Sequence, residues 1–315
     1  MFGSRRYPDS SMDFSTRRSI VIESSHRDEP AIRPDDQDVV VKYFFHEGEF
    51  WKAVIPLDGI DEVRGQAFNF SKVKTRVGEK GPEIIFGDDG FPKRTIPMLN
   101  HLQSRFILKG DHSVRLYRLE SDARGDPVHE VNDFVYSVEA VGPVGTRFNL
   151  RDACSGSLFS AHRFYSTRQM VFERIVVEGQ YVMESPSLPI QESEKRGLLV
   201  ESLLRSHRAG NQERYYLYRC YRTNNCTSNP FEILDNVVGY RLPQRIGSFL
   251  YRLPLNPRFY LRVRGLDVNP GVRKQVRSEF EEYIGAPETK RQKREYVRSQ
   301  LRAVRAARAG DLQES

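Results

Sequence analysis

Residues 214–235, with the sequence RYYLYRCYRTNNCTSNPFEILD, join an aromatic run to a polar turn and then to a helical pattern. The aromatic run favours a strand, because aromatic side chains fit the half-buried surface of a sheet. After the Asn-Asn-Cys-Thr-Ser-Asn turn at 224–229, the spacing of Phe231, Leu234 and Val238 predicts a helix. This stretch therefore predicts a strand, a turn and a helix in succession.

The segments on either side of this stretch differ in their hydrophobic period. Between residues 39 and 189, runs such as FWKAVIPL, SVRLYRL, DFVYSVEAV and RIVVEGQYVM are separated by Gly, Pro and Asp turns, which predicts strands. Apolar residues at helical spacing predict a helix over 191–207 and two more over 272–285 and 293–310, separated by Ala-Pro-Glu at 286–288. We therefore expect an α+β fold in which an antiparallel, twisted sheet packs against helices.

Composition divides the chain into three parts. Residues 1–37 are rich in Ser, Arg, Asp and Pro, so we expect a mostly disordered N-terminal tail before a domain over 38–269. The remaining part, 270–315, is basic: from Arg273 to Arg308 there are eleven Lys or Arg against five Glu, a balance of +6 out of the net +7 of the chain. This basic segment is interpreted either as a solvated helical face or as a contact surface for nucleic acid, anionic lipid or a partner chain.

Several functional classes are disfavoured. Three cysteines without a Cys-x-x-Cys pair do not form a disulfide scaffold or a structural zinc site. The chain has no phosphate-binding glycine loop, and we expect neither a metal nor an organic cofactor. It also has no apolar run of the length that a secretory signal or a membrane span needs, so we expect a cytoplasmic protein.

Cys226 is the residue most suited to act as a nucleophile. Main-chain N–H groups at a helix N-terminus can lower the pKa of a nearby thiol and can stabilise an oxyanion. We therefore expect Asn224, Asn225 and Thr227 to support Cys226 at the start of the helix. The alternative is that Cys226 is a buried small residue without chemistry, and we expect the same of Cys154. Cys220, within the tyrosine run, is not expected to form a disulfide.

The tyrosine run and the Asn-Asn-Cys-Thr-Ser-Asn core at 224–229 resemble the DUF4105, or Lnb N-terminal periplasmic domain, family. The resemblance covers about Asp58 to Asp267 and is sharpest at the cysteine motif. It implies a permuted papain-like fold related to the NlpC/P60 enzymes, with a thiol nucleophile that acts in a hydrolase or an acyltransferase. Members of this family are mostly periplasmic.

The resemblance also implies partners for Cys226. A His-x-x-x-x-Phe pattern matches His101 to Phe106, and a following Ser-Val-Glu matches residues 137–139. Carried over, these matches make Cys226 the nucleophile, His101 the general base and Glu139 an orienting residue. His112, beside Asp111, is the reserve base.

Four of the other histidines, His26, His46, His129 and His207, are expected to face solvent or to cap a helix. His162 is a third possible base.

The leading functional hypothesis is a cysteine-dependent hydrolase or acyltransferase that acts on an amide or ester bond through a Cys226–His101 dyad. The alternative is a non-catalytic papain-like binding or assembly protein that uses its basic tail.

Overall fold

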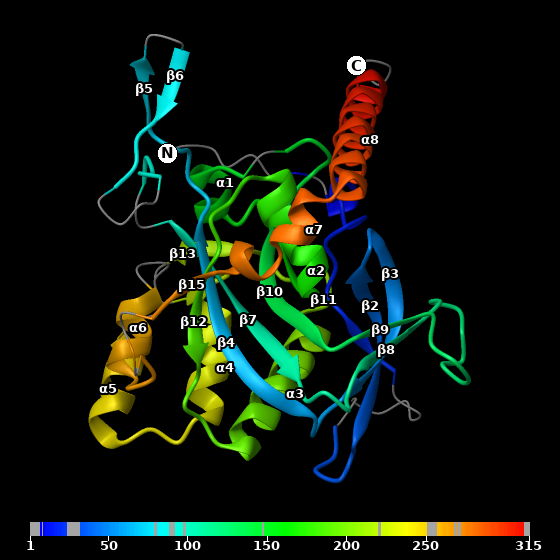
Figure 1. Ribbon diagram of the computed structural model, residues 1–315, viewed down its shortest axis with the longest axis vertical. Helices are drawn as coiled ribbons and strands as arrows, with labels where there is room; N and C mark the ends of the chain where they lie inside the picture. Colours follow the sequence, from blue (N-terminus) through cyan, green and yellow to red (C-terminus); the bar gives the residue numbers. More distant parts are fainter. Residues whose placement is uncertain are drawn as a thin grey trace.

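The computed structural model describes residue 7 and residues 9–23, 32–78, 81–87, 92–96, 99–146, 148–219, 222–250, 257–267, 269 and 272–311. One large sheet, in the order β15-β12-β4-β7-β10-β11-β2-β3-β8-β9 with β1 beside β2, organises these residues (Figure 1). Its strands are β1 (Val21–Ile22), β2 (Asp38–His46), β3 (Glu49–Pro56), β4 (Ile60–Asn69), β7 (Asn100–Leu108), β8 (Val114–Tyr117), β9 (His129–Val131), β10 (Asp133–Val141), β11 (Phe159–Ser166), β12 (Met183–Ser187) and β15 (Lys274–Gln275).

Helices and two small hairpins surround the sheet. The helices are η1 (Asp9–Ser11), α1 (Leu150–Ser155), α2 (Thr167–Met170), η2 (Val171–Val177), α3 (Glu192–Ala209), α4 (Ser228–Val237), α5 (Leu242–Leu250), α6 (Pro257–Val263), η3 (Val276–Glu279), α7 (Glu281–Gly285) and α8 (Pro287–Asp311). The hairpins are β5 (Thr75–Gly78) with β6 (Gly81–Ile84), and β13 (Tyr216–Arg219) with β14 (Arg222–Asn224). This architecture confirms the α+β class.

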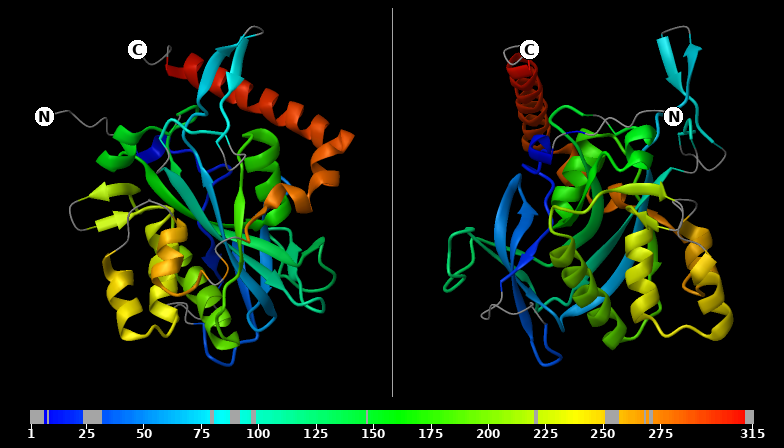
Figure 2. Two further views of the ribbon diagram at one scale, coloured as in Figure 1. Left: turned by 60° about the vertical axis from the view of Figure 1, so that its left-hand side comes forward. Right: turned by 180° about the vertical axis from the view of Figure 1, so that it is seen from behind.

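The sheet is mixed rather than purely antiparallel. Most neighbouring strands are antiparallel, but β11 pairs with β2 in parallel through Tyr165 and Phe45. The sheet is covered on both faces, and for this reason most residues of β10 are buried although they alternate between the two faces. Helices α3 and α4 cover one face, whereas α2, η2, η3 and α7 lie on the other (Figures 1 and 2).

The face under α3 and α4, called the helical face below, is apolar at its centre. Leu102 and Phe106 of β7 and Phe134 of β10 contact an apolar core that includes Leu203 of α3 and Phe231 of α4. The opposite face contains a second apolar cluster, which includes Phe68, Val135, Tyr165 and Met170. It also contains most of the buried charged side chains of the sheet, and we call it the polar face.

The N-terminal part is more ordered than its composition suggests. Ile20 is fully buried, and β1 extends the sheet beside β2. The main-chain N–H of Ile20 donates to Ser206 Oγ of α3, and that of Ile22 donates to His207 Nδ1. The expectation of disorder up to residue 37 is therefore wrong for residues 9–23, because the short apolar patch at 20–22 is enough to dock this segment.

Two predicted elements take a different form. The run RIVVEGQYVM is not a strand: its first half ends the π-helix η2, where burial of Ile175 and Val176 outweighs the strand preference of β-branched residues. The predicted helix over 272–285 is divided into β15, η3 and α7, since β15 pairs with β12 instead. By contrast, α3, α4 and α8 confirm the other predicted helices to within a few residues, apart from an earlier start of α4 and α8.

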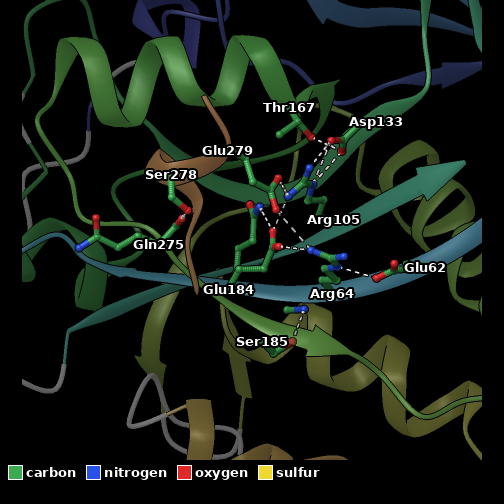
Figure 3. Close-up of polar contacts among 12 residues, drawn as sticks. Glu62, Arg64, Arg105, Asp133, Thr167, Glu184, Ser185, Gln275, Ser278 and Glu279 are labelled. Atoms are coloured by element: carbon green, nitrogen blue, oxygen red, sulfur yellow. Dashed lines mark hydrogen bonds and ion pairs between the residues drawn. The ribbon is translucent and has the colours of Figure 1, made fainter. Parts of the chain in front are cut away.

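A network of charged side chains on the polar face ties this C-terminal segment to the sheet (Figure 3). Arg105 of β7 donates to Asp133 of β10, to Glu184 of β12 and to Glu279 of η3. Arg64 of β4 also binds Glu184, at 2.8 Å. Arg105 and Glu184 are almost fully buried, so each needs the opposite charge of the other to offset the cost of its removal from water. The segment after residue 270 therefore begins as part of the main domain and not as a separate extension.

This network predicts a large effect of the Arg105→Leu substitution. The variant leaves the buried Glu184 carboxylate without one of its cations, so we expect the free energy of unfolding to fall by about 3–5 kcal/mol in a urea titration. The matched control is Arg76→Leu, which breaks the exposed pair with Glu83 and should change stability far less. Equal effects of the two substitutions would contradict a structural role for the network.

Candidate functional site

Cys226 lies between β14 and α4, at the point that the sequence predicts. The side chain of the preceding Asn225 closes this turn: its Oδ1 accepts hydrogen bonds from the main-chain N–H groups of Thr227 (2.8 Å) and Ser228 (2.9 Å). Ser228 Oγ in turn accepts from the N–H of Asn225. The motif thus orders the start of α4, but Asn225 already occupies two of the N–H groups that an oxyanion would need.

The Cys226 thiol is buried, with 1% of the residue exposed. The Tyr215 hydroxyl donates to Sγ over 3.5 Å, and Sγ lies 3.8 Å from the carbonyl oxygen of Asn100, to which the thiol can donate. Burial raises the pKa of the Cys226 thiol, although the Tyr215 hydroxyl works in the opposite direction. The site therefore holds a neutral thiol at rest.

Asn224 has a structural role next to this thiol. Its Nδ2 donates to Glu213 and to the carbonyl oxygen of Arg214, and its Oδ1 accepts from Asn229 of α4. The predicted supports Asn224, Asn225 and Thr227 are therefore all at the turn, where they join β13 and β14 to α4.

His101 does not meet Cys226. Side chains alternate along β7, so His101 shares the polar face with the paired Phe68 of β4, whereas its neighbour Leu102 points toward α3 and α4. The imidazole stacks on Phe68 at 4.8 Å between ring centroids, and its Nε2 lies 2.7 Å from Ser137 Oγ. The Cys226 Sγ atom instead contacts the main chain of β7, at the carbonyl oxygen of Asn100 and the N–H of Leu102. Among the described residues no hydrogen bond joins His101 to Cys226, so the predicted dyad is not formed.

Glu139 lies on the polar face with His101, in a buried cluster of charges. Its carboxylate binds Arg163 at 3.0 Å, Arg174 at 2.6 Å and Arg17 at 3.0 Å. Burial opposes ionisation, but these guanidinium groups hold the pKa of Glu139 well below its ordinary value. The two residues that the resemblance selected from β7 and β10 therefore do come together, but without the thiol.

The two other histidines considered as bases, His112 and His162, differ in position and exposure. His112 is partly exposed and lies beyond the far end of β7 from Asn100, where its Nδ1 is 2.8 Å from Asp111. His162 of β11 is fully buried on the helical face, and its Nδ1 is 2.8 Å from the Tyr136 hydroxyl. Its Nε2 is buried and has no hydrogen-bond partner among the described residues. His162 therefore lies on the helical face, two strands away from β7.

Other residues also depart from expectation. Cys154 is exposed rather than buried. His46 is buried at 5% exposure instead of facing solvent. Cys220 and His26 lie outside the described residues.

A second candidate site is the exposed side of α8. Five arginines, Arg291, Arg294, Arg298, Arg302 and Arg305, follow one another at intervals of three or four residues. At about 100° and 1.5 Å per residue, they occupy an arc of about 80° and a length of about 21 Å. All five are exposed, and none forms an ion pair with another described residue. We call this set the arginine stripe.

The opposite side of α8 fixes the helix to the body. The Tyr296 ring contacts Phe172 of η2 edge to face, with centroids 5.9 Å apart, and Thr289 is buried. Val304 packs over Gly145, where a Cβ atom would come within 3.2 Å of a Val304 methyl group. The helix is therefore held along its length with the arginine stripe turned outward, and it runs along the outside of the molecule (Figure 2).

In comparisons with known proteins, no family model, curated protein or solved structure matched the chain. Among the described helices, none is long and apolar enough to cross a membrane.

The position of His101 predicts how stability depends on pH. Burial, assisted by Arg174, lowers the pKa of its imidazole to about 3. Below pH 6.5 the unfolded chain therefore binds a proton that the folded chain does not, so stability falls as the pH drops. Between pH 7 and pH 5, the His101→Gln variant should lose about 2 kcal/mol less unfolding free energy than the wild type in urea titrations. Equal losses would show that His101 is protonated in the folded protein.

Proposed function

We propose that the chain is a binding protein whose arginine stripe contacts the phosphate groups of a nucleic acid. The observation that carries this proposal is the contrast between α8 and the body. Buried arginines of the body, such as Arg105, Arg163 and Arg264, bind carboxylates of the same chain. Among the described residues, the five guanidinium groups of the arginine stripe have no carboxylate partner, which leaves them available to a ligand.

Arginine suits this ligand. A guanidinium group is planar and can bind two phosphate oxygens at once, so a row of such groups fits a chain of phosphates. Helix α8 contains eight Lys or Arg against three Asp or Glu, which adds a long-range attraction to polyanions. Contacts of this type fix position without reading bases, so the expected binding has little sequence preference.

A membrane surface is a poorer fit to α8. Helices that lie in a lipid interface bury a broad apolar face among the acyl chains. The side of α8 that contains Tyr296 and Val304 is already packed on the body, and the exposed apolar residues Val297 and Leu301 lie at the flank of the arginine stripe. The charge of α8 is therefore better matched to a nucleic acid than to a bilayer.

Binding of a single-stranded oligonucleotide, measured by fluorescence anisotropy over a range of salt concentrations, tests this proposal. The double substitution Arg298→Gln with Arg302→Gln should weaken binding and make the slope of log K against log salt shallower by about 0.7 per lost contact. The matched control is Lys72→Gln with Lys74→Gln, which removes the same charge from an exposed part of the body. Anionic vesicles serve as the second probe.

Two results would contradict the proposal. One is an equal loss of binding in the two double variants, because binding would then depend on the net charge of the protein and not on the position of the arginines on α8. The other is binding to anionic vesicles without binding to the oligonucleotide.

A second candidate function rests on the thiol. The contact between the Tyr215 hydroxyl and Cys226 Sγ, next to the start of α4, favours a hydrolase or acyltransferase of the permuted papain-like type that resembles the DUF4105 family. Cys226 would attack an amide or ester carbonyl, release the amine or alcohol and leave a thioester for water or an acceptor to cleave. Because His101 contacts Ser137 and not Cys226, this reaction requires another base, for which the candidate is His162, whose buried Nε2 has no hydrogen-bond partner among the described residues.

The rate at which Cys226 is alkylated tests whether its thiol is activated, as the second candidate function requires. Because the Cys226 thiol is buried and its pKa is raised, iodoacetamide at pH 6 should modify Cys226 of the native protein more slowly than the exposed Cys154. Peptide mapping by mass spectrometry reports the two rates in one sample, and unfolding in urea should make them similar. Faster modification of Cys226 than of Cys154 in the native protein would instead favour the thiol enzyme.

A further inference from the structure

The turn between β2 and β3 brings together a set of side chains that neither candidate function uses. Glu47 and Gly48 form a two-residue turn with φ values of 48° and 83°, which is typical of a tight hairpin. Pairing of His46 with Glu49 closes the hairpin. Glu47 therefore projects next to His46, and its Oε1 lies 4.0 Å from His46 Nε2.

His129 reaches the same place from β9. Its ring contacts Trp51 of β3 edge to face at 4.9 Å and lies 5.1 Å from the His46 ring, both between centroids. Trp51 in turn donates from Nε1 to the carbonyl oxygen of His46. One potential ligand atom each from His46, Glu47 and His129 thus lies within 4.8 Å of the others, although the residues come from different parts of the chain.

The His46 ring is already oriented for binding a metal. Its Nδ1 lies 2.8 Å from Ser166 Oγ, at the end of β11. When Nδ1 donates its proton in this contact, Nε2 keeps its lone pair and points toward Glu47. Histidine ligands of metals usually have such a partner on the second ring nitrogen, and it fixes both tautomer and orientation.

We propose that His46, Glu47 and His129 form a binding site for a divalent transition-metal ion of the Zn²⁺ type. Two imidazoles and one carboxylate are a ligand set that zinc accepts, with a fourth position left for water. Ligands at about 2.1 Å around a tetrahedral ion are about 3.4 Å apart, so the site must contract on binding. Glu47 can supply this movement, because its side chain is 49% exposed on the turn. The ion would fasten the β2–β3 turn to β9.

Titration of the metal-free full-length protein with Zn²⁺ by calorimetry, and with Co²⁺ by visible absorption, tests this proposal. We expect one equivalent to bind to the wild type and to raise its melting temperature. Glu47→Gln, an exposed substitution that does not threaten folding, should weaken binding by more than about tenfold, as should His129→Ala. Ser166→Ala should weaken Zn²⁺ binding by about tenfold, because it removes the hydrogen-bond partner of His46 Nδ1 and so no longer fixes the orientation of the ring.

The matched control is His112→Ala, which removes a partly exposed histidine beside an acidic residue but outside this cluster. This variant should bind Zn²⁺ like the wild type. Equal affinity of the wild type and Glu47→Gln, or an equal loss in His112→Ala, would overturn the proposal. Absence of Co²⁺ absorption typical of a tetrahedral site in the wild type would also overturn it.

Discussion

Two arginines that lie inside the protein, Arg163 and Arg174, share the carboxylate of Glu139 between β10, β11 and the π-helix η2. A charge removed from water is very costly unless a partner of opposite sign lies beside it. Each of these side chains therefore restricts where its neighbours can lie, and Arg105 with Glu184 imposes the same restriction on β7, β12 and η3. Together, these pairs determine which face of the central strands is polar and which is apolar.

This division also affects which residues of the sequence motif can act together in the folded chain. His101 belongs to the polar face, where burial and the cationic groups around it lower its pKa, while the Cys226 thiol contacts a tyrosine hydroxyl and a carbonyl oxygen. Many titratable groups of the body thus hold its elements together. On α8, whose inner side is anchored by Tyr296, five exposed arginines instead follow one another along one side without an ion pair to a described residue, and the functional proposal follows from this row.

The local spacing of apolar residues was sufficient to predict several helices and strands. The helical period of residues 191–207 predicted α3, and the run DFVYSVEAV coincides with β10. This spacing was insufficient where tertiary contacts decide the outcome. Ile175 and Val176 form part of a π-helix because they are buried there, and residues 274–275 pair with β12 although their apolar spacing is helical. The spacing between His101 and Cys226 gave no information on which face of β7 the imidazole occupies, since one residue of register reverses it.

The folded protein keeps the imidazole of His101 apart from the thiol of Cys226, because His101 is engaged with Ser137 and Phe68 instead. Treatment of the native protein with 1,3-dibromoacetone, a reagent that bridges a thiol and an imidazole only when they are in contact, tests it directly, with peptide mapping of the product. We expect no cross-link between the peptides that contain Cys226 and His101. A cross-linked pair of these two peptides in the folded protein would contradict it.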